Sequence, residues 1–217
     1  MNLRLRQLGF LPYEPVWHAM QAFTAGRDAG TTDELWLVEH PPIFTLGLAG
    51  KTHHVITPGD IEILHVDRGG QVTYHGPGQC ILYVLLDIRR LQLGVRTLVK
   101  RLEQVAVTCL RHHGITASVR REAPGVYVDQ QKIAALGLRV RQGRCYHGLA
   151  LNVDMDLEPF SRINPCGFPG LEVTQLANFG ISSSVDAEGQ SLAAQLASEF
   201  GYAMQDVSDE SFKLVAS

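Results

Sequence analysis

A cysteine in a short turn motif is the first side chain in this sequence that could perform covalent chemistry. Cys166 stands in the run Asn-Pro-Cys-Gly at residues 164–167, where proline and glycine favour a tight turn. The turn places the thiol outside any apolar periodicity, in a setting that suits a reactive cysteine. A thiolate can accept an acyl group and release it again, so Cys166 is a candidate nucleophile. A lone cysteine in a turn is more often inert, and this alternative stays open from the residue alone.

The other three cysteines have the pattern of core residues. Cys109 lies on the apolar face of a predicted helix, and Cys80 opens a strongly apolar, strand-like run. Cys145 alternates with His147 and the leucines that follow it, so we expect these side chains to point into the core. No C-x-x-C pair exists, and the two adjacent histidine pairs lack the spacing of metal ligands. We therefore expect no metal site.

A lysine at the start of an apolar strand is the second candidate. Residues 132–140 alternate with period two, and Lys132 shares one face with Ala134 and Leu136. A lysine on such a face either extends to solvent from the strand end or lies in a low-dielectric pocket, where its neutral form is favoured. The first outcome is the commoner one, and the pattern alone favours it. A pocket would let the lysine exchange a proton with a nearby thiol.

A glycine-rich segment carries the third set of candidates. Residues 68–79 read Arg-Gly-Gly-Gln-Val-Thr-Tyr-His-Gly-Pro-Gly-Gln. They form either a hairpin loop between two strands or a backbone that approaches a ligand closely, and composition does not decide between the two. The segment is not a dinucleotide fingerprint, because Ile81 occupies the position of the third glycine. Gly-Lys-Thr at residues 50–52 is not a phosphate-binding loop, because Thr45 replaces the required first glycine.

Strands and helices that follow one another along the chain must position these residues. Strand-like patterns occur at residues 3–5, 35–38, 43–46, 61–66, 80–88, 126–128, 132–140 and 144–153. The alternation of the first slips at residues 7–8, and Gln142-Gly143 joins the last two as a hairpin signal. Helical spacing occurs at residues 16–23, at 95–110 before Gly114, and at 192–200 before Gly201. We expect one α+β domain over residues 1–217, with a mixed, mostly antiparallel sheet packed against helices.

Composition and charge exclude several classes of protein. The chain is 45% hydrophobic and has a net charge of −3, so it can bury a core and has no positive field for nucleic acid or anionic membranes. No run approaches the roughly 20 apolar residues of a membrane span, and the N-terminus lacks the apolar stretch of a signal peptide. We therefore expect a cytoplasmic monomer with reduced cysteines and with no nucleic-acid or membrane partner.

Four motifs, taken in order along the chain, resemble the lipoyl(octanoyl) transferases. They are the segment at 68–79, Lys-Ile-Ala-Ala-Leu-Gly at 132–137, His-Gly-Leu-Ala-Leu-Asn-Val at 147–153, and Ile-Asn-Pro-Cys-Gly at 163–167. The resemblance spans most of the chain and implies the fold of the biotin and lipoate protein ligase catalytic domains. It further implies transfer of an octanoyl group from acyl carrier protein to a lysine of lipoyl domains, the first step of protein lipoylation. The lipoyl domains would be those of 2-oxoacid dehydrogenase E2 subunits and of the glycine cleavage H protein.

The resemblance also implies roles for single residues. Cys166 would form the acyl-thioester intermediate, Lys132 would be its partner, and no cofactor would be needed. His75 would be a third catalytic residue, which either orients the site or takes part in proton transfer. The acyl site would be lined by Arg68, Gly69, Gly70, Gln71, Val72, Thr73, Tyr74, His75, Ala135, Leu136, Gly137, Gly148, Leu149 and Ala150.

Thioester chemistry suits this assignment. Transfer from a carrier thioester to a thiolate is nearly thermoneutral, and attack by an amine then gives a stable amide without ATP. One rival is an ATP-dependent lipoate or biotin protein ligase on the same fold, which would need no cysteine. A second rival is a non-catalytic carrier-binding module. A set of arginines forms either a solvated basic face or a docking surface for the acidic carrier: Arg120, Arg121, Arg139, Arg141 and Arg144.

Overall fold

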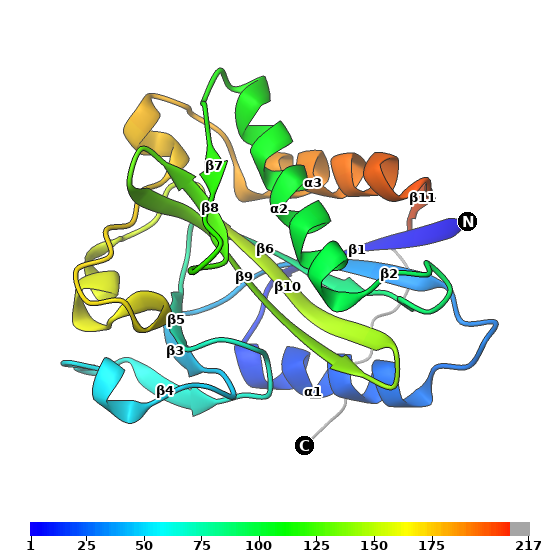
Figure 1. Ribbon diagram of the computed structural model, residues 1–217, viewed down its shortest axis with the longest axis horizontal. Coiled ribbons are helices and arrows are strands. Elements are labelled where there is room, and N and C mark those ends of the chain that lie inside the picture. The colour runs from blue at the N-terminus through cyan, green and yellow to red at the C-terminus, as the bar shows by residue number, and fades with distance from the viewer. Residues whose placement is uncertain (209–217) are drawn as a thin grey trace.

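Two sheets organise the computed structural model, which describes residues 1–208 (Figure 1). The main sheet has the strand order β11-β1-β2-β6-β10-β9-β8-β7. Its strands are β1 (Asn2–Phe10), β2 (Asp33–Glu39), β6 (Gln79–Leu85), β7 (Ser118–Val119), β8 (Gly125–Val128), β9 (Gln131–Arg141), β10 (Arg144–Asn152) and β11 (Ala203–Asp206). Strand β1 runs parallel to β2 and β11, and all other neighbours are antiparallel. The predicted α+β class with a mixed, mostly antiparallel sheet is confirmed.

Three α-helices cover the two faces of the main sheet in the described part of the chain (Figure 1). Helices α2 (Val95–His112) and α3 (Val185–Phe200) pack on one face, and α1 (Tyr13–Gly26) packs on the other. Their apolar stripes are buried, as the helical spacing predicts. No helix within residues 1–208 is long and apolar enough to span a membrane.

The slip in the alternation of the first strand has a structural cause. Strand β1 continues to Phe10, but its register against β2 shifts between Gln7 and Gly9. Leu8 is the extra residue of a β-bulge, which reverses the faces of the residues that follow. The predicted strand at residues 3–5 is therefore the first part of a longer one.

The smaller sheet contains one strand that the sequence analysis missed. It has the order β4-β3-β5, with β3 (Ile43–Leu46), β4 (Glu62–His65) and β5 (Val72–His75). Residues 72–75 lie within the glycine-rich segment, so the hairpin-loop interpretation is wrong for them. Val72 and Tyr74 pack with Phe44 in a separate apolar cluster, which holds this short strand between its flanking glycines. The small sheet thus carries the middle of the glycine-rich segment.

The hairpin of β9 and β10 forms as predicted. Gln142 and Gly143 both have positive φ, 51° and 74°, as a two-residue turn between twisted strands requires. The register sets Gly148 opposite Gly137, and Leu149 and Ala150 opposite Leu136 and Ala135. Two of the four sequence motifs are therefore cross-strand neighbours.

Candidate active site

Cys166 lies on a strained turn at one end of a pocket. The 3₁₀ turn Pro165–Gly167 contains Cys166 at φ 57°, followed by Gly167 at φ 79°. The turn is closed by the Gly167 N–H, which donates to the Asn164 carbonyl at 2.9 Å. A non-glycine residue in the left-handed region costs on the order of 1–3 kcal/mol and is found most often at functional sites. The thiol is partly exposed on a turn, whereas the other three cysteines are buried, as their patterns predict.

Lys132 and Cys166 meet although 34 positions separate them in the sequence. Nζ of Lys132 lies 2.8 Å from Sγ of Cys166 and donates to the carbonyl of Pro124 at 2.9 Å. The lysine is only 4% exposed, so the solvent-extended arrangement that the pattern favoured is wrong. A β-bulge explains the difference: Lys132 pairs with Tyr127 and Ala134 pairs with Val126, which leaves Ile133 unpaired.

The surroundings of Lys132 make room for a buried ammonium. Gly125 has φ 143°, and a Cβ there would lie 2.4 Å from Cε of Lys132, so no larger residue fits. The ring of Tyr127 lies with its centroid 5.5 Å from Nζ. Burial raises the pKa of Glu103, and a hydrogen bond from the Gly125 N–H and the charge of Lys132 partly offset this. Among residues 1–208, no carboxylate lies within 4 Å of Nζ.

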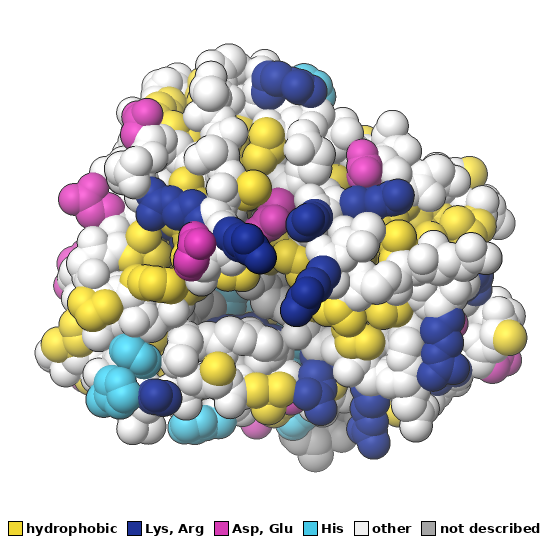
Figure 2. Space-filling model, in the orientation of Figure 1, with side chains coloured by type: hydrophobic (Ala, Val, Ile, Leu, Met, Phe, Trp, Pro, Cys, Tyr) yellow, Lys and Arg dark blue, Asp and Glu magenta, His cyan; other side chains and the backbone are white. Residues whose placement is uncertain are grey.

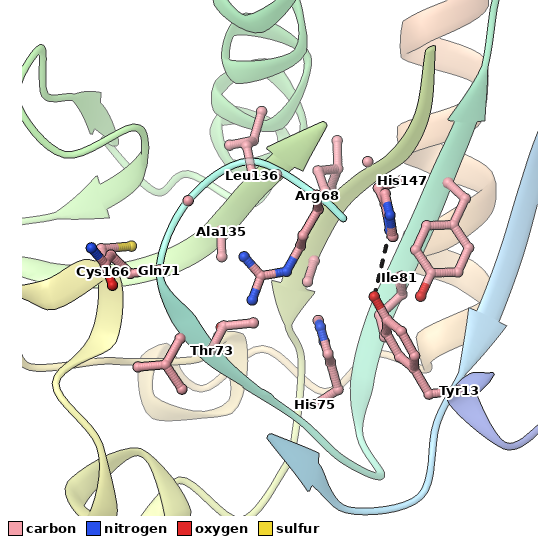
Figure 3. A pocket seen from close by; sticks show the side chains of 17 residues that line it. Tyr13, Arg68, Gln71, Thr73, His75, Ile81, Ala135, Leu136, His147 and Cys166 are labelled. Carbon is pink, nitrogen blue, oxygen red and sulfur yellow. Dashed lines mark hydrogen bonds between the residues drawn. The ribbon is translucent and has the colours of Figure 1, made fainter. Parts of the chain in front are cut away.

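A pocket extends from Cys166 into the molecule, between the main sheet and the small one (Figure 3). The pocket is narrow, with about 50 Å³ of space open to the centre of a water-sized molecule. Figure 2 shows a hollow near the middle of the corresponding face, with basic side chains beside it. Its lining consists of Tyr13, Arg68, Gly70, Gln71, Val72, Thr73, His75, Ile81, Tyr83, Ala135, Leu136, Gly137, His147, Gly148, Leu149, Ala150 and Cys166. Small and apolar residues of β9 and β10 form one wall, which suits an alkyl chain.

Two of the expected acyl-site residues do not line this pocket. The ring of Tyr74 points away and packs on Phe44 and Phe160, with ring centroids 5.6 Å and 5.4 Å away. Gly69 makes a backbone contact instead: its N–H donates to the Leu138 carbonyl at 2.8 Å. Strand alternation turns Tyr74 from the cavity, and a backbone contact does the same for Gly69.

His75 lies deep in the pocket, apart from Cys166 (Figure 3). Its Nδ1 lies 2.7 Å from Oε1 of Gln79, whose amide nitrogen donates to Oδ1 of Asn152 at 2.9 Å. Asn152 in turn donates to the Thr174 carbonyl. Since Oε1 of Gln79 can only accept, Nδ1 of His75 carries the proton. Burial, the nearby His40 and other positive groups lower the pKa of His75 to about 3, so the ring is neutral near pH 7.

The inner end of the pocket is built by aromatic residues that the sequence analysis did not select. Tyr13, Tyr83 and His147 are each 3% exposed or less. The Tyr83 hydroxyl lies 2.8 Å from Nε2 of His40, and Tyr13 OH lies 3.5 Å from Nδ1 of His147. Their polar ends therefore have partners inside the protein, and the inner end is buried.

His147 has turned to the face opposite the one predicted. Its φ is 61°, so its ring does not follow Cys145 into the core but stacks on Tyr146. Nε2 of His147 lies 3.0 Å from Oδ1 of Asp67. The Asp67 carboxylate also accepts hydrogen bonds from Trp17 at Oδ1 and from Tyr146 at Oδ2. These hydrogen bonds hold the pKa of Asp67 well below its usual range, although burial acts against them. The sequence offers one signal for this pair of residues: His147 is the first residue of the motif at 147–153, and Asp67 directly precedes the segment at 68–79.

Comparison with known proteins connects this geometry to a family. The family model described as the lipoyl protein ligase A/B catalytic domain matches residues 12–197. Octanoyltransferases of Shewanella amazonensis and Thiobacillus denitrificans are 56% and 58% identical to the chain, covering 93% and 90% of it and 93% and 89% of their own lengths. A lipoate protein ligase of Thermoplasma acidophilum has a TM-score of 0.76 at 17% identity, covering 95% of this chain and 88% of its own. A biotin protein ligase of Aquifex aeolicus has a TM-score of 0.52 at 10% identity, covering 93% of this chain and 69% of its own.

The chain therefore belongs to the lipoyl protein ligase A/B catalytic domain family, and it shares its fold with lipoate and biotin protein ligases. Its curated relatives place it more narrowly among the octanoyltransferases, which are acyltransferases that move an octanoyl group in protein lipoylation. The fold and family expected from the four motifs are confirmed.

Proposed function

We propose that the protein takes an octanoyl group from acyl carrier protein, holds it as a thioester on Cys166, and passes it to a lysine of a lipoyl domain. The observation that carries this proposal is the 2.8 Å contact between Nζ of Lys132 and Sγ of Cys166 at the end of an apolar pocket. An ammonium beside a thiol stabilises the thiolate, which is the reactive form. The pocket then receives the alkyl chain of the acyl group.

The first half-reaction exchanges one thioester for another. The Cys166 thiolate attacks the carbonyl carbon of the carrier thioester, forming the new S–C bond. The bond to the carrier sulfur breaks, and that sulfur takes a proton from the Lys132 ammonium. Both sides of the reaction contain one thioester and one thiol, so the step is close to thermoneutral.

The second half-reaction forms the amide. The neutral amine of the acceptor lysine attacks the Cys166 thioester, and the C–S bond breaks as the C–N bond forms. Neutral Lys132 accepts the proton that the amine loses, which restores the pair of ammonium and thiolate. An amide is more stable than a thioester, so this step runs downhill without ATP.

His75 acts by orienting the site in this scheme. Its pKa of about 3 makes it a weak base near pH 7, and its Nδ1 proton is committed to Gln79. The chain from His75 through Gln79 and Asn152 ends at the Thr174 carbonyl. Thr174 belongs to the segment whose backbone pairs with Lys132, through its N–H and the Lys132 carbonyl at 2.9 Å. These contacts support a positioning role over proton transfer.

Partners follow from the same chemistry. A lipoate protein ligase of similar fold comes from an archaeal lipoylation system with an E2 lipoyl domain, which supports lipoyl domains as acceptors. The proposal extends the same chemistry to the glycine cleavage H protein. Arg120 and Arg121 lie in the loop between β7 and β8, which also carries the Pro124 carbonyl bonded to Lys132. A basic loop beside the thiol suits an acidic carrier protein. In this proposal residues 1–217 act as one catalytic domain, a cytoplasmic monomer.

The proposal is tested by incubating the purified protein with octanoyl-acyl carrier protein in the absence of ATP. Intact-mass spectrometry should show one octanoyl group on the protein, and peptide mapping should place it on Cys166. Adding a lipoyl domain should then move the mass to that domain. An ATP-dependent ligase would instead require ATP and free octanoate, and a protein that stays unmodified with the carrier thioester would contradict the proposal.

A further inference from the structure

The turn that carries Cys166 does not offer its following backbone N–H groups to a substrate. Gly167 donates to the Asn164 carbonyl at 2.9 Å. Phe168 donates to the Pro165 carbonyl at 3.1 Å. Attack of a thiolate on a thioester places negative charge on the carbonyl oxygen until the second C–S bond breaks, and such an oxygen needs a hydrogen-bond donor. The donor has to come from another segment of the chain.

The Lys132 ammonium is already used in this step. It donates to the Pro124 carbonyl at 2.9 Å and lies 2.8 Å from Sγ of Cys166. In the proposed transfer it also gives a proton to the departing carrier sulfur. A lysine that has given up this proton no longer has the charge that would stabilise an oxyanion. A neutral donor that keeps its N–H groups throughout the reaction is therefore better suited to the carbonyl oxygen.

Gln71 lies directly against the cysteine turn and lines the same pocket (Figure 3). A Cβ on Gly167 would lie 3.3 Å from Cγ and 3.5 Å from Cδ of this glutamine. Because position 167 has no side chain, the amide group can approach the turn closely. Gln71 immediately precedes β5, and the alternation of that strand places Gln71, Thr73 and His75 along the pocket.

A second loop fixes the orientation of the Gln71 amide. Its Oε1 accepts a hydrogen bond from the Lys51 N–H at 3.2 Å. Because a backbone N–H can only donate, the oxygen of the amide has to face Lys51, which leaves Nε2 on the other side. In the described part of the chain, residues 1–208, Nε2 has no acceptor. The same loop is bonded to the cysteine turn, because the Asn164 N–H donates to the His54 carbonyl at 2.7 Å.

We propose that Gln71 is a further catalytic residue, whose Nε2 donates to the carbonyl oxygen of the acyl group on Cys166. This inference rests on the proposed function, because it concerns thioester chemistry at that cysteine. In the first half-reaction the oxygen gains charge as the S–C bond forms and loses it as the carrier sulfur leaves. In the second it gains charge as the amine adds and loses it as the Cys166 sulfur leaves. One fixed donor therefore serves both steps.

Two reactions of Cys166 separate a donor from a structural support. Octanoyl transfer from the carrier passes through an oxyanion, whereas iodoacetamide alkylation displaces iodide at a saturated carbon and does not. In Gln71→Met the rate of octanoyl transfer should fall about a hundred-fold to a thousand-fold, and the alkylation rate should stay nearly unchanged. The control is Gln104→Met, an exposed glutamine of α2, which should keep both rates.

The other outcomes of this comparison overturn the proposal. Equal losses of both rates in Gln71→Met would show that the side chain only supports the turn or the pair of Cys166 and Lys132. Unchanged rates of both reactions would show that the oxygen has another donor.

A second variant separates the donor from the contact with Lys51. Gln71→Glu keeps an oxygen for the Lys51 N–H but loses both amide N–H groups. The proteins are loaded from carrier with an octanoyl group labelled with ¹³C at its carbonyl carbon and compared by difference infrared spectroscopy. A hydrogen bond lowers the stretching frequency of a carbonyl group, so the labelled band should lie at a higher frequency in Gln71→Glu and Gln71→Met than in the unmodified protein.

The spectra also distinguish this inference from the proposed function. A labelled band at the same frequency in all three proteins would overturn the role of Gln71 and leave the thioester on Cys166 intact. If the unmodified protein forms no labelled thioester, the proposed function itself is contradicted, and the role of Gln71 is overturned with it.

Discussion

The two ends of the pocket are built in opposite ways. At the outer end, Cys166 has a left-handed backbone on a partly exposed turn, and Lys132 lies at a β-bulge. At the inner end, Tyr13, Tyr83 and His147 are almost fully buried, and their polar atoms lie near other side chains. Figure 3 shows Cys166 on one side of Arg68, and Tyr13 and His147 on the other. A partly exposed turn and a β-bulge thus carry the thiol and the lysine, and a buried cluster of aromatic side chains closes the cavity.

This difference separates two requirements of the chemistry. A nucleophile must meet a carrier protein and then a lipoyl domain, so it has to lie near the surface, where loops and bulges can place it. A pocket that measures an alkyl chain must keep its depth, so its end has to be rigid. If this comparison is right, variants at the outer end change the rate of transfer, and variants at the inner end change the preference for chain length or the stability.

The largest effect is expected for Cys166→Ser. An alkoxide is far harder to form than a thiolate, and an oxygen ester releases its acyl group less readily. The rate of octanoyl transfer from carrier to lipoyl domain should therefore fall about a thousand-fold or more, measured by mass spectrometry of the lipoyl domain. Cys109→Ala is the control and should leave the rate nearly unchanged, because Cys109 is a buried residue of α2 on its core-facing side. Transfer by Cys166→Ser at the rate of the unmodified protein would rule out the covalent route.

A smaller loss is expected for Lys132→Met, which keeps the length of the side chain but removes the ammonium. Loss of a general acid and base should lower the transfer rate about a hundred-fold to ten-thousand-fold. The rate of iodoacetamide alkylation of Cys166 at pH 7 should also fall, because the thiolate loses its neighbouring cation. Lys100→Met removes an exposed lysine of α2 and serves as the control. An unchanged alkylation rate in Lys132→Met would show that the 2.8 Å contact has no electrostatic role.

The same contrast explains how much the sequence could predict. The hairpin of β9 and β10, the long helix α2 and the buried state of three cysteines follow from periodicity and turn residues, which are local properties. The burial of Lys132 and the orientation of His147 depend on one unpaired residue and one positive φ. The alternation of residues along a strand does not predict either deviation, because both are stabilised by contacts with distant residues such as Cys166 and Asp67.

Strand β5 is another element that local sequence patterns do not predict. Its four residues lie between glycines, and only pairing with β3 and packing on Phe44 and Phe160 make them a strand. Tyr13 and Tyr83 were not selected, because an aromatic residue at a strand or helix position is normally core. Their place at the end of a pocket becomes visible only when β6, β10 and the start of α1 come together.

At the inner end, Ile81→Ala should change which acyl chain is preferred. Ile81 lines the pocket and is 1% exposed, so its truncation deepens the cavity and should raise the rate with decanoyl carrier relative to octanoyl carrier several-fold. The matched control is Leu82→Ala on the same strand, which is equally buried but belongs to the core on the opposite face. Both should lose about 2–5 kcal/mol of stability. If the ratio of the two rates changes alike in both variants, the inner end does not measure the chain.

The smallest effect concerns the pH dependence of stability. Burial lowers the pKa of His40 to about 4 and that of His75 to about 3, whereas an unfolded histidine has a pKa near 6.5. Below pH 6.5 the unfolded chain therefore binds more protons, so the free energy of unfolding falls as the pH is lowered toward 4. Each of the two should contribute a slope of about 1.4 kcal/mol per pH unit, measured by urea denaturation at a series of pH values.

The variant His40→Gln measures how much of this pH dependence comes from the inner end of the pocket. His40→Gln should reduce the slope by about 1.4 kcal/mol per pH unit, the contribution of one proton. It also lowers the stability at pH 7, because the Tyr83 hydroxyl loses its partner at 2.8 Å. His112→Gln, at an exposed position of α2, should not change the slope. Asp67 acts in a separate window, because its lowered pKa contributes stability that is lost only as the pH falls below about 3.8. An unchanged slope in His40→Gln would mean that this histidine is protonated in the folded protein, and the inner end would then be charged and less rigid than the contacts indicate.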